Sequence, residues 1–212
     1  GARASLALSK TQDARTPLPR HTQTKKHPQN KHSPLDLRSK IAFGAATAAY
    51  QIEGGWNAGG KGPTIWDKWV RPSDQGGCGC VAEGATGDVA ADHYNRFRDD
   101  VALMRSLGIK HYRLSISWPR LLPKGVVDKG GGGVSADGVA FYTNLARALR
   151  AAGITPTATL YHWDLPQALQ DSYGGFASAD PARFAADFAA YAEVAFRELS
   201  GPGLVDEWIT FN

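Results

Sequence analysis

Polar and aromatic side chains gather at the ends of short segments that the sequence predicts to be strands. Gln51 lies at the end of the first such segment, His162 and Trp163 at the end of the third, and Asn212 at the end of the fourth. Planar amide and imidazole groups can exchange hydrogen bonds with neighbouring hydroxyl groups. Indole rings offer large apolar faces that can cover the C–H face of a sugar ring. If the strand ends converge, these four residues are typical of a carbohydrate site.

Each of these residues also has a purely structural interpretation. Gln51 could be a surface amide, and His162 could be a hydrogen-bonded histidine of the core. Trp163, like Trp118 at the end of the second strand segment, could pack in the core instead of against a ligand. Only the shared position at strand ends favours a binding site over these alternatives.

The elements that position these residues alternate along the chain. Apolar residues recur at spacings of three and four in three segments, which predicts helices. Asp180 and Pro181 are typical of the N-cap and first turn of the last helix. Four shorter apolar segments predict strands, and strands that alternate with helices are typical of a parallel α/β fold. The predicted helices cover residues 91–107, 139–152 and 181–199, and the predicted strands cover residues 41–50, 111–118, 154–162 and 205–211.

The second strand segment indicates which kind of parallel sheet to expect. One side of it carries Arg113, Ser115 and Ser117, and the other carries Tyr112, Leu114 and Ile116. Strands of an open doubly wound sheet are apolar on both sides because helices cover both faces. A polar face therefore favours a (β/α) barrel, in which the active site lies at the carboxyl ends of the strands. The glycine patterns of nucleotide-binding loops do not open any predicted helix, which argues against a nucleotide.

Charge and composition exclude several classes of protein. The chain has 212 residues and a net charge of +4. Residues 1–40 contain nine Lys or Arg and two Asp, so they carry +7, and the other residues carry 15 − 18 = −3. We predict a disordered basic tail over residues 1–40 and a folded domain over residues 41–212. The acidic folded part argues against nucleic acid, and no apolar run approaches the ~18 residues of a membrane helix.

The tail and the two cysteines leave alternatives open. The tail could be a solvated extension or the remnant of an organelle-targeting peptide, so the chain could be organellar or cytoplasmic. Cys78 and Cys80 are too few for a disulfide framework or a zinc site, and we expect either free thiols or a cross-linked loop.

Six stretches of the chain form a set of motifs in a fixed order: residues 43–54, 60–67, 92–97, 112–120, 161–167 and 208–212. Together they resemble the N-terminal part of family 1 glycoside hydrolases, the β-glucosidase family. The resemblance implies the N-terminal half of a (β/α)₈ TIM barrel and retaining hydrolysis of terminal β-D-glucosyl residues through a glycosyl-enzyme intermediate. It implies a small β-glycoside as the binding partner and no cofactor or metal.

The resemblance also implies a role for each candidate residue. Gln51 and His162 match positions that hold the hydroxyl groups of the terminal sugar, and Trp163 matches an aromatic residue that lines the same subsite. Asn212 matches an amide that contacts the 2-hydroxyl group. Arg113 matches an arginine beside the nucleophilic carboxylate, where a positive charge favours the ionised form.

The resemblance places both catalytic carboxylates outside this chain. In the family the asparagine at the Asn212 position is followed by Glu-Pro, and that glutamate is the acid/base. The nucleophile lies further downstream, and retaining hydrolysis needs both groups. We therefore expect the chain by itself to be inactive. The glutamates it does contain are interpreted as loop or helix-surface carboxylates: Glu53, Glu83, Glu193, Glu198 and Glu207.

Two other functions share every visible motif. One is a catalytically inactive protein of the same fold that binds a sugar or a partner. The other is a thioglucosidase, in which the acid/base position holds glutamine. We also expect the four strands alone to form half a barrel with two bare edges, and so a poorly soluble or molten chain.

Overall fold

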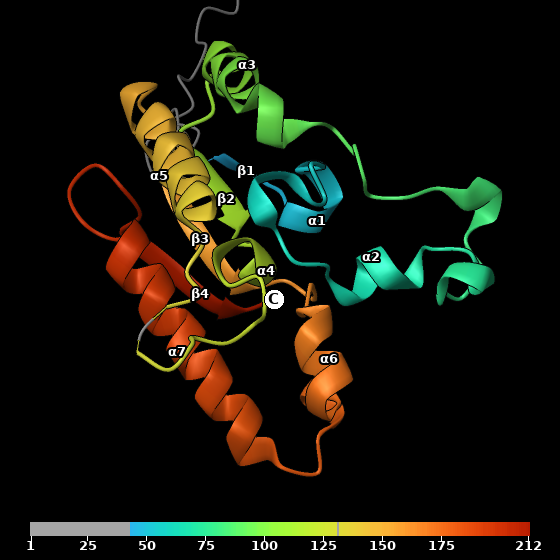
Figure 1. The fold of residues 1–212 in the computed structure, drawn as a ribbon. Helices are drawn as coiled ribbons and strands as arrows, with labels where there is room; N and C mark the ends of the chain where they lie inside the picture. Colours follow the sequence, from blue (N-terminus) through green and yellow to red (C-terminus); the bar gives the residue numbers. More distant parts are fainter. Residues whose placement is uncertain (1–42, 131) are drawn as a thin grey trace, which may run out of the picture. The chain divides into compact units, whose positions relative to one another are not determined.

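The computed structural model describes residues 43–130 and 132–212, so the predicted tail over residues 1–40 lies outside the described residues. Four parallel strands form one sheet in the order β1-β2-β3-β4 (Figure 1). This confirms the predicted parallel α/β fold. The strands are β1 (Gly44–Ala46), β2 (His111–Ser115), β3 (Thr155–Tyr161) and β4 (Glu207–Phe211).

Three long helices connect the strands, as the apolar spacing predicts. Asp180 caps the last of them by accepting a hydrogen bond from the Arg183 amide at 3.1 Å, and Pro181 occupies its first turn, which confirms that prediction. The middle helix begins three residues earlier than expected because Ser135 caps it through the Gly138 amide at 3.1 Å. The long helices are α3 (His93–Ser106), α5 (Ala136–Ala151) and α7 (Pro181–Leu199).

Shorter helices follow the strand ends and were not predicted. The α-helical ones are α1 (Ala49–Ile52), α2 (Ile65–Trp69), α4 (Trp118–Leu121) and α6 (Gln167–Tyr173). Single 3₁₀ turns lie at Ala58–Gly60, Ser73–Gln75, Ala82–Gly84 and Gly175–Ala177. Among the described residues, no helix combines the length and the apolar character that a membrane crossing requires.

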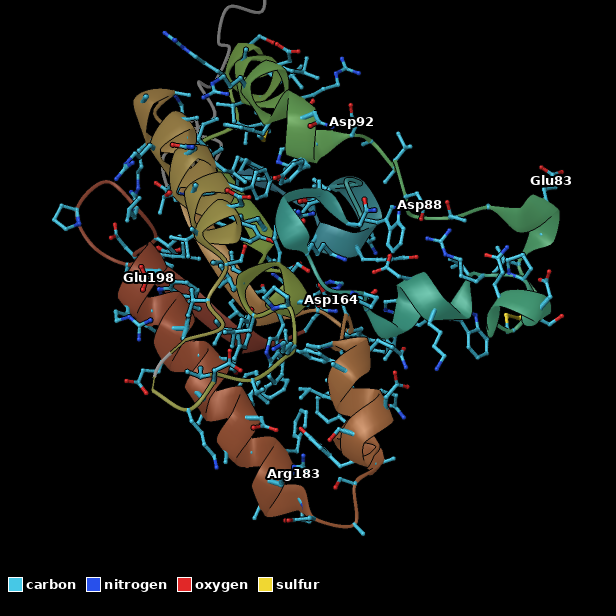
Figure 2. The ribbon with its side chains drawn as sticks, viewed as in Figure 1. Glu83, Asp88, Asp92, Asp164, Arg183 and Glu198 are labelled. Atoms are coloured by element: carbon cyan, nitrogen blue, oxygen red, sulfur yellow. A yellow bond between two sulfur atoms is a disulfide. The ribbon has the colours of Figure 1, made fainter. Side chains whose placement is uncertain are left out.

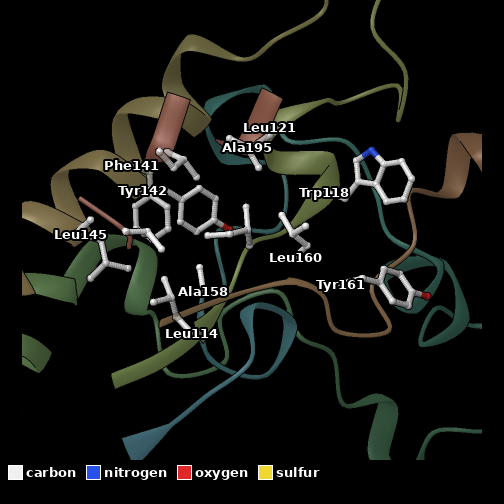
Figure 3. Packing of buried hydrophobic residues seen from close by; sticks show 14 of the residues in the cluster. Leu114, Trp118, Leu121, Phe141, Tyr142, Leu145, Ala158, Leu160, Tyr161 and Ala195 are labelled. Carbon is white, nitrogen blue, oxygen red and sulfur yellow. The ribbon is translucent and has the colours of Figure 1, made fainter. Parts of the chain in front are cut away.

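The core lies where the sheet packs against α5 and α7 (Figure 3). Tyr112, Leu114 and Ile116 are all buried in it, which confirms the predicted apolar side of β2 and the residue that follows it. Tyr191 of α7 is also fully buried, and its one hydroxyl hydrogen is shared between the carbonyl oxygens of Ile116 at 3.1 Å and Leu160 at 2.8 Å. These bonds fix α7 against the ends of β2 and β3.

The first two strands end earlier than predicted. The residues expected at their carboxyl ends lie on short helices instead. Ala49 begins α1 and donates its amide hydrogen bond to Ser115 Oγ at 2.7 Å, so Gln51 lies on α1 instead of on a strand. Trp118 begins α4, and Pro119 suits the first turn of that helix because proline lacks an amide hydrogen. Trp118 is fully buried and stacks on Tyr191 with ring centroids 4.6 Å apart. It is therefore a core residue.

Candidate functional site

Arg113, Trp163 and Asn212 meet at the carboxyl ends of the strands. The Arg113 guanidinium donates one hydrogen bond to Thr159 Oγ1 and one to Asn212 Oδ1, each at 2.9 Å. Trp163 Nε1 donates to the carbonyl oxygen of Asn212 at 3.3 Å. Arg113 lies on β2 and Thr159 on β3, while Asn212 follows β4, so the side chain of Arg113 spans three adjacent strands. The structure thus brings together the ends of β3 and β4 with Arg113 of β2, whereas Trp118 from the end of the second predicted strand lies in the core.

These contacts fix which end of the Asn212 side-chain amide accepts a hydrogen bond and which end can donate one. Its oxygen accepts a hydrogen bond from Arg113, and no acceptor among the described residues bonds its NH₂ group, which can therefore donate to a ligand. Trp163 is 57% exposed, and its ring therefore offers an apolar surface beside that donor. The candidate site thus places a hydrogen-bond donor next to an exposed indole ring.

Gln51 and His162 are near the strand ends by sequence, but the described residues give no hydrogen bond that joins their side chains to Arg113 or Asn212. Gln51 is exposed on α1, and His162 is half-buried after β3. Their assignment as sugar-binding residues stays a prediction.

Glu53 corrects the interpretation of the glutamates as surface carboxylates. It is only 5% exposed, because α1 turns it inward. Its Oε2 accepts from Arg120 Nε at 2.9 Å, and its Oε1 accepts from the Tyr142 hydroxyl group at 2.7 Å. Arg120 also lies over the Tyr94 ring, 4.3 Å from its centroid. A buried carboxylate can stay charged when a nearby cation and further hydrogen bonds offset the cost of removing it from water. Arg120 and Tyr142 provide both for Glu53.

The other four glutamates fit the interpretation from sequence. Glu83, Glu193 and Glu207 are exposed, and Glu198 pairs with its neighbour Arg197 on α7. Glu207 is the first residue of β4, at the opposite end of that strand from Asn212, and its Oε2 accepts from Thr157 Oγ1 at 2.6 Å.

Asp164 is a second buried carboxyl group close to the candidate site (Figure 2). It follows Trp163 directly, is 1% exposed, and lies on the segment between β3 and α6. Burial, and next the negative charge of Glu53, raise the pKa of Asp164 to about 7. The group is therefore poised between its neutral and charged forms near neutral pH.

Cys78 and Cys80 form a disulfide in the loop between α2 and α3, visible as the yellow bond in Figure 2. This resolves the two alternatives in favour of a cross-linked loop. The described residues contain no group of three or more His, Cys, Asp or Glu arranged to hold a metal ion.

Glu53, Arg120 and Asp164 are among the buried polar residues whose burial was not predicted from sequence. Glu53 and Arg120 lie 67 positions apart, and no spacing rule links residues at that separation. The sequence gives only a weak indication that these residues belong near the site. Asp164 directly follows His162 and Trp163, and Arg120 lies just beyond the end of a predicted strand.

Known proteins match most of this chain. The sequence profile of glycosyl hydrolase family 1 matches residues 34–212. Oleuropein beta-glucosidase of Olea europaea is 48% identical over 177 residues, which cover 84% of this chain and 30% of that protein. Beta-glucosidase A of Acetivibrio thermocellus is 46% identical, with 82% of this chain and 37% of that protein covered.

A solved structure of similar fold agrees with these sequence matches. Beta-glucosidase from Thermotoga maritima in complex with castanospermine has a TM-score of 0.70 and 44% identity, and the match covers 81% of this chain and 36% of that one. The chain thus spans about a third of the length of the curated relatives it matches. The strand order, the convergence of Arg113 with Asn212 and the matches agree, and the chain belongs to glycosyl hydrolase family 1.

Proposed function

We propose that this chain forms the N-terminal part of a retaining β-glycosidase that hydrolyses terminal β-D-glucosyl residues through a glycosyl-enzyme intermediate. In this proposal Gln51, His162, Trp163 and Asn212 bind the sugar, and Arg113 supports the nucleophile. The acid/base residue follows Asn212 directly, the nucleophile lies further along, and the 212 residues alone are inactive.

The contact between Arg113 and Asn212 is the observation that carries the proposal. It brings a fixed positive charge to the strand ends and orients the Asn212 amide so that its NH₂ group can donate to a hydroxyl group. An arginine at this point would also favour the charged form of a nearby nucleophilic carboxylate. The related enzyme from Thermotoga maritima binds castanospermine, which supports a small sugar-like ligand for this chain as well.

The experiment uses the full-length protein and two substrates, 4-nitrophenyl β-D-glucoside and a β-thioglucoside. We expect hydrolysis of the O-glucoside with retained configuration at the anomeric carbon. NMR spectra recorded during the reaction measure that configuration. Turnover of the thioglucoside alone would favour a thioglucosidase. Sugar binding without turnover of either substrate would favour a binding protein, and would contradict the proposal.

A further inference from the structure

Six buried side-chain atoms have no hydrogen-bond partner among the described residues, and they border two small cavities. Five of these atoms belong to Tyr50, Asp67, Ser117 and Asp164, which all line the first cavity. The sixth is Nε2 of His93, which lines the second. Each cavity leaves about 10 Å³ for the centre of a water molecule. That space is about enough for one buried water, which needs two to four polar partners.

In the first cavity the unpaired groups are those that a water molecule can satisfy. Asp164 and Ser117 are each 1% exposed, and among the described residues neither Asp164 oxygen nor Ser117 Oγ has a hydrogen-bond partner of good geometry. The backbone amide groups of His162 and Asp164 lie close enough to the Asp164 carboxylate to lower its pKa, but burial outweighs them. A hydroxyl group can donate and accept, a carboxylate accepts, and a protonated carboxyl group does both. Leaving such groups unpaired in the interior would destabilise the fold, because a buried polar group without a partner loses its hydration with no compensation. A polar occupant is therefore expected.

The charges around the cavity favour water over a cation. Arg120 pairs with Glu53 at 2.9 Å, and Lys61 pairs with Asp67 at 3.0 Å. Two of the three acidic groups are therefore already compensated, and Asp164 alone is left. Burial raises the pKa of Asp164 to about 7, and a carboxyl group that can be neutral has no need of a bound cation.

The backbone turn at Trp163, directly before Asp164, is the part of the chain that this carboxyl group could hold in place. Trp163 has a φ of 70°, in the left-handed region that bulky residues rarely adopt. Such strained backbone persists only when the surrounding structure fixes it. Asp164 is the buried neighbour of this turn, and none of Gln51, His162, Trp163 or Asn212 lines the cavity into which it faces. The cavity therefore shares no lining residue with the candidate sugar site, and Asp164 links it to the turn.

We propose that Asp164 and Ser117 bind one buried water molecule in the first cavity, and that the hydrated carboxyl group positions the turn at residues 162–163. Asp164 is then a positioning residue that acts through His162 and Trp163. The water site itself needs only the cavity and the unpaired groups, whereas the effect on sugar binding rests on the proposed function.

The first test is a high-resolution crystal structure of the full-length protein. One ordered water is expected within about 2.6–3.2 Å of an Asp164 oxygen and of Ser117 Oγ. Crystals soaked in rubidium chloride should show no anomalous peak in the cavity. An empty cavity, or a rubidium peak between these residues, would overturn the water site.

Three variants of the full-length protein test the positioning role. Asp164→Leu keeps a similar volume and removes every hydrogen bond, whereas Asp164→Asn keeps the ability to bind the water. Asp99→Leu makes the matched change at an exposed position of α3. The expected result is a KM for 4-nitrophenyl β-D-glucoside raised about tenfold in Asp164→Leu, with a smaller change in kcat, and largely restored in Asp164→Asn. Asp99→Leu should match the wild type.

Two further measurements test the positioning role if the kinetics of Asp164→Leu are not informative. The crystal structure of Asp164→Leu should show the turn at residues 162–163 displaced, and this readout does not depend on activity. If that variant does not fold, Ser117→Ala removes one water ligand with little change in volume, and a raised KM of about threefold is expected. An undisplaced turn or unchanged KM values would overturn the positioning role. A wild type without activity would instead contradict only the proposed function.

Discussion

At the scale of single residues, the proposed function depends on the orientation of the Asn212 amide, whose oxygen accepts a hydrogen bond from Arg113. Asn212→Asp keeps an acceptor for Arg113 but removes the NH₂ donor. Because a sugar hydroxyl group would then face an acceptor that also carries negative charge, we expect kcat/KM of the full-length protein to fall about 100-fold, roughly 2.7 kcal/mol. Steady-state kinetics with an aryl β-glucoside measure this.

The matched control for that substitution is Asn144→Asp, the same change at an exposed position of α5. Wild-type kinetics are expected for it. Equal kcat/KM values for Asn212→Asp and the wild type would show that the amide does not contact the substrate.

Asp164 makes the stability of the fold depend on pH. Its pKa is about 7 in the folded protein against an ordinary value of 3.8. Between these values the folded state binds more protons than the unfolded state, so the contribution of Asp164 is fully present below about pH 4 and is lost as the pH rises to 7. The loss amounts to at most about 4 kcal/mol, because one pKa unit corresponds to 1.36 kcal/mol.

Asp164→Asn should remove this dependence. The measurement is the free energy of urea unfolding of the full-length protein between pH 4 and pH 8, taken as the difference between the wild type and the variant. The variant is expected to gain stability relative to the wild type as the pH rises. A difference that stays constant over this range would mean that Asp164 titrates alike in the folded and unfolded states.

At the scale of elements, the buried pair of Arg120 and Glu53 joins α4 to the loop that follows α1. Arg120 also donates to the carbonyl oxygen of Gly54 at 3.2 Å, so one side chain holds both a carboxylate and the backbone. Arg120→Met keeps the apolar stem but leaves Glu53 as an uncompensated buried charge. We expect a loss of about 3–5 kcal/mol in the free energy of unfolding, measured by urea denaturation.

Arg197→Met provides the comparison on α7. Arg197 pairs with Glu198 at 2.9 Å on an exposed surface, with its own side chain 54% exposed. Exposed pairs of this kind contribute about 0–1 kcal/mol. If the two substitutions destabilised the protein equally, the buried network would not hold α4 against the loop.

The loop between α2 and α3 should depend little on its disulfide. Only Gly79 separates Cys78 from Cys80, and so short a cross-link removes little entropy from the unfolded chain. The double variant Cys78→Ser and Cys80→Ser is expected to lose about 1.5 kcal/mol or less. A larger loss in urea denaturation would mean that the cross-link orders more of the fold than its own loop.

The elements that could be predicted from sequence are those with their own periodic signal. The helix α7 has an apolar stripe, a capping Asp180 and Pro181 in its first turn, and all three are local. The helix α1 has four residues, too few for a period, and it exists because the Ala49 amide finds Ser115 Oγ across 66 positions. Long-range hydrogen bonds of this kind leave no pattern in a local window.

The candidate site divides in the same way. The order of parallel strands puts Arg113 and Asn212 on the two strands that flank β3 or directly after them, and the long Arg113 side chain reaches across β3 to Asn212. The inward direction of Glu53 depends on α1, whose formation was not predicted, so its partnership with Arg120 became visible only in the structure.

At the scale of the whole molecule, the sheet has two edges among the described residues. The strand β1 pairs there only with β2, and β4 pairs only with β3. Phe43 beside β1 is 64% exposed, and Phe211 at the end of β4 is 46% exposed. Unpaired edges next to exposed apolar side chains favour association between chains.

The 212 residues expressed alone should therefore be molten or aggregated, whereas the full-length protein should melt cooperatively. The relatives are about three times as long as the matched segment, and a closed barrel would pair both edges and cover both phenylalanines. Near-ultraviolet circular dichroism during heating and sedimentation velocity measure the two properties. A sharp melting transition from a monomer of the 212 residues would show that the core between the sheet, α5 and α7 is sufficient by itself. In that case the four-stranded part would fold without closure of the barrel, and closure would be needed only for catalysis.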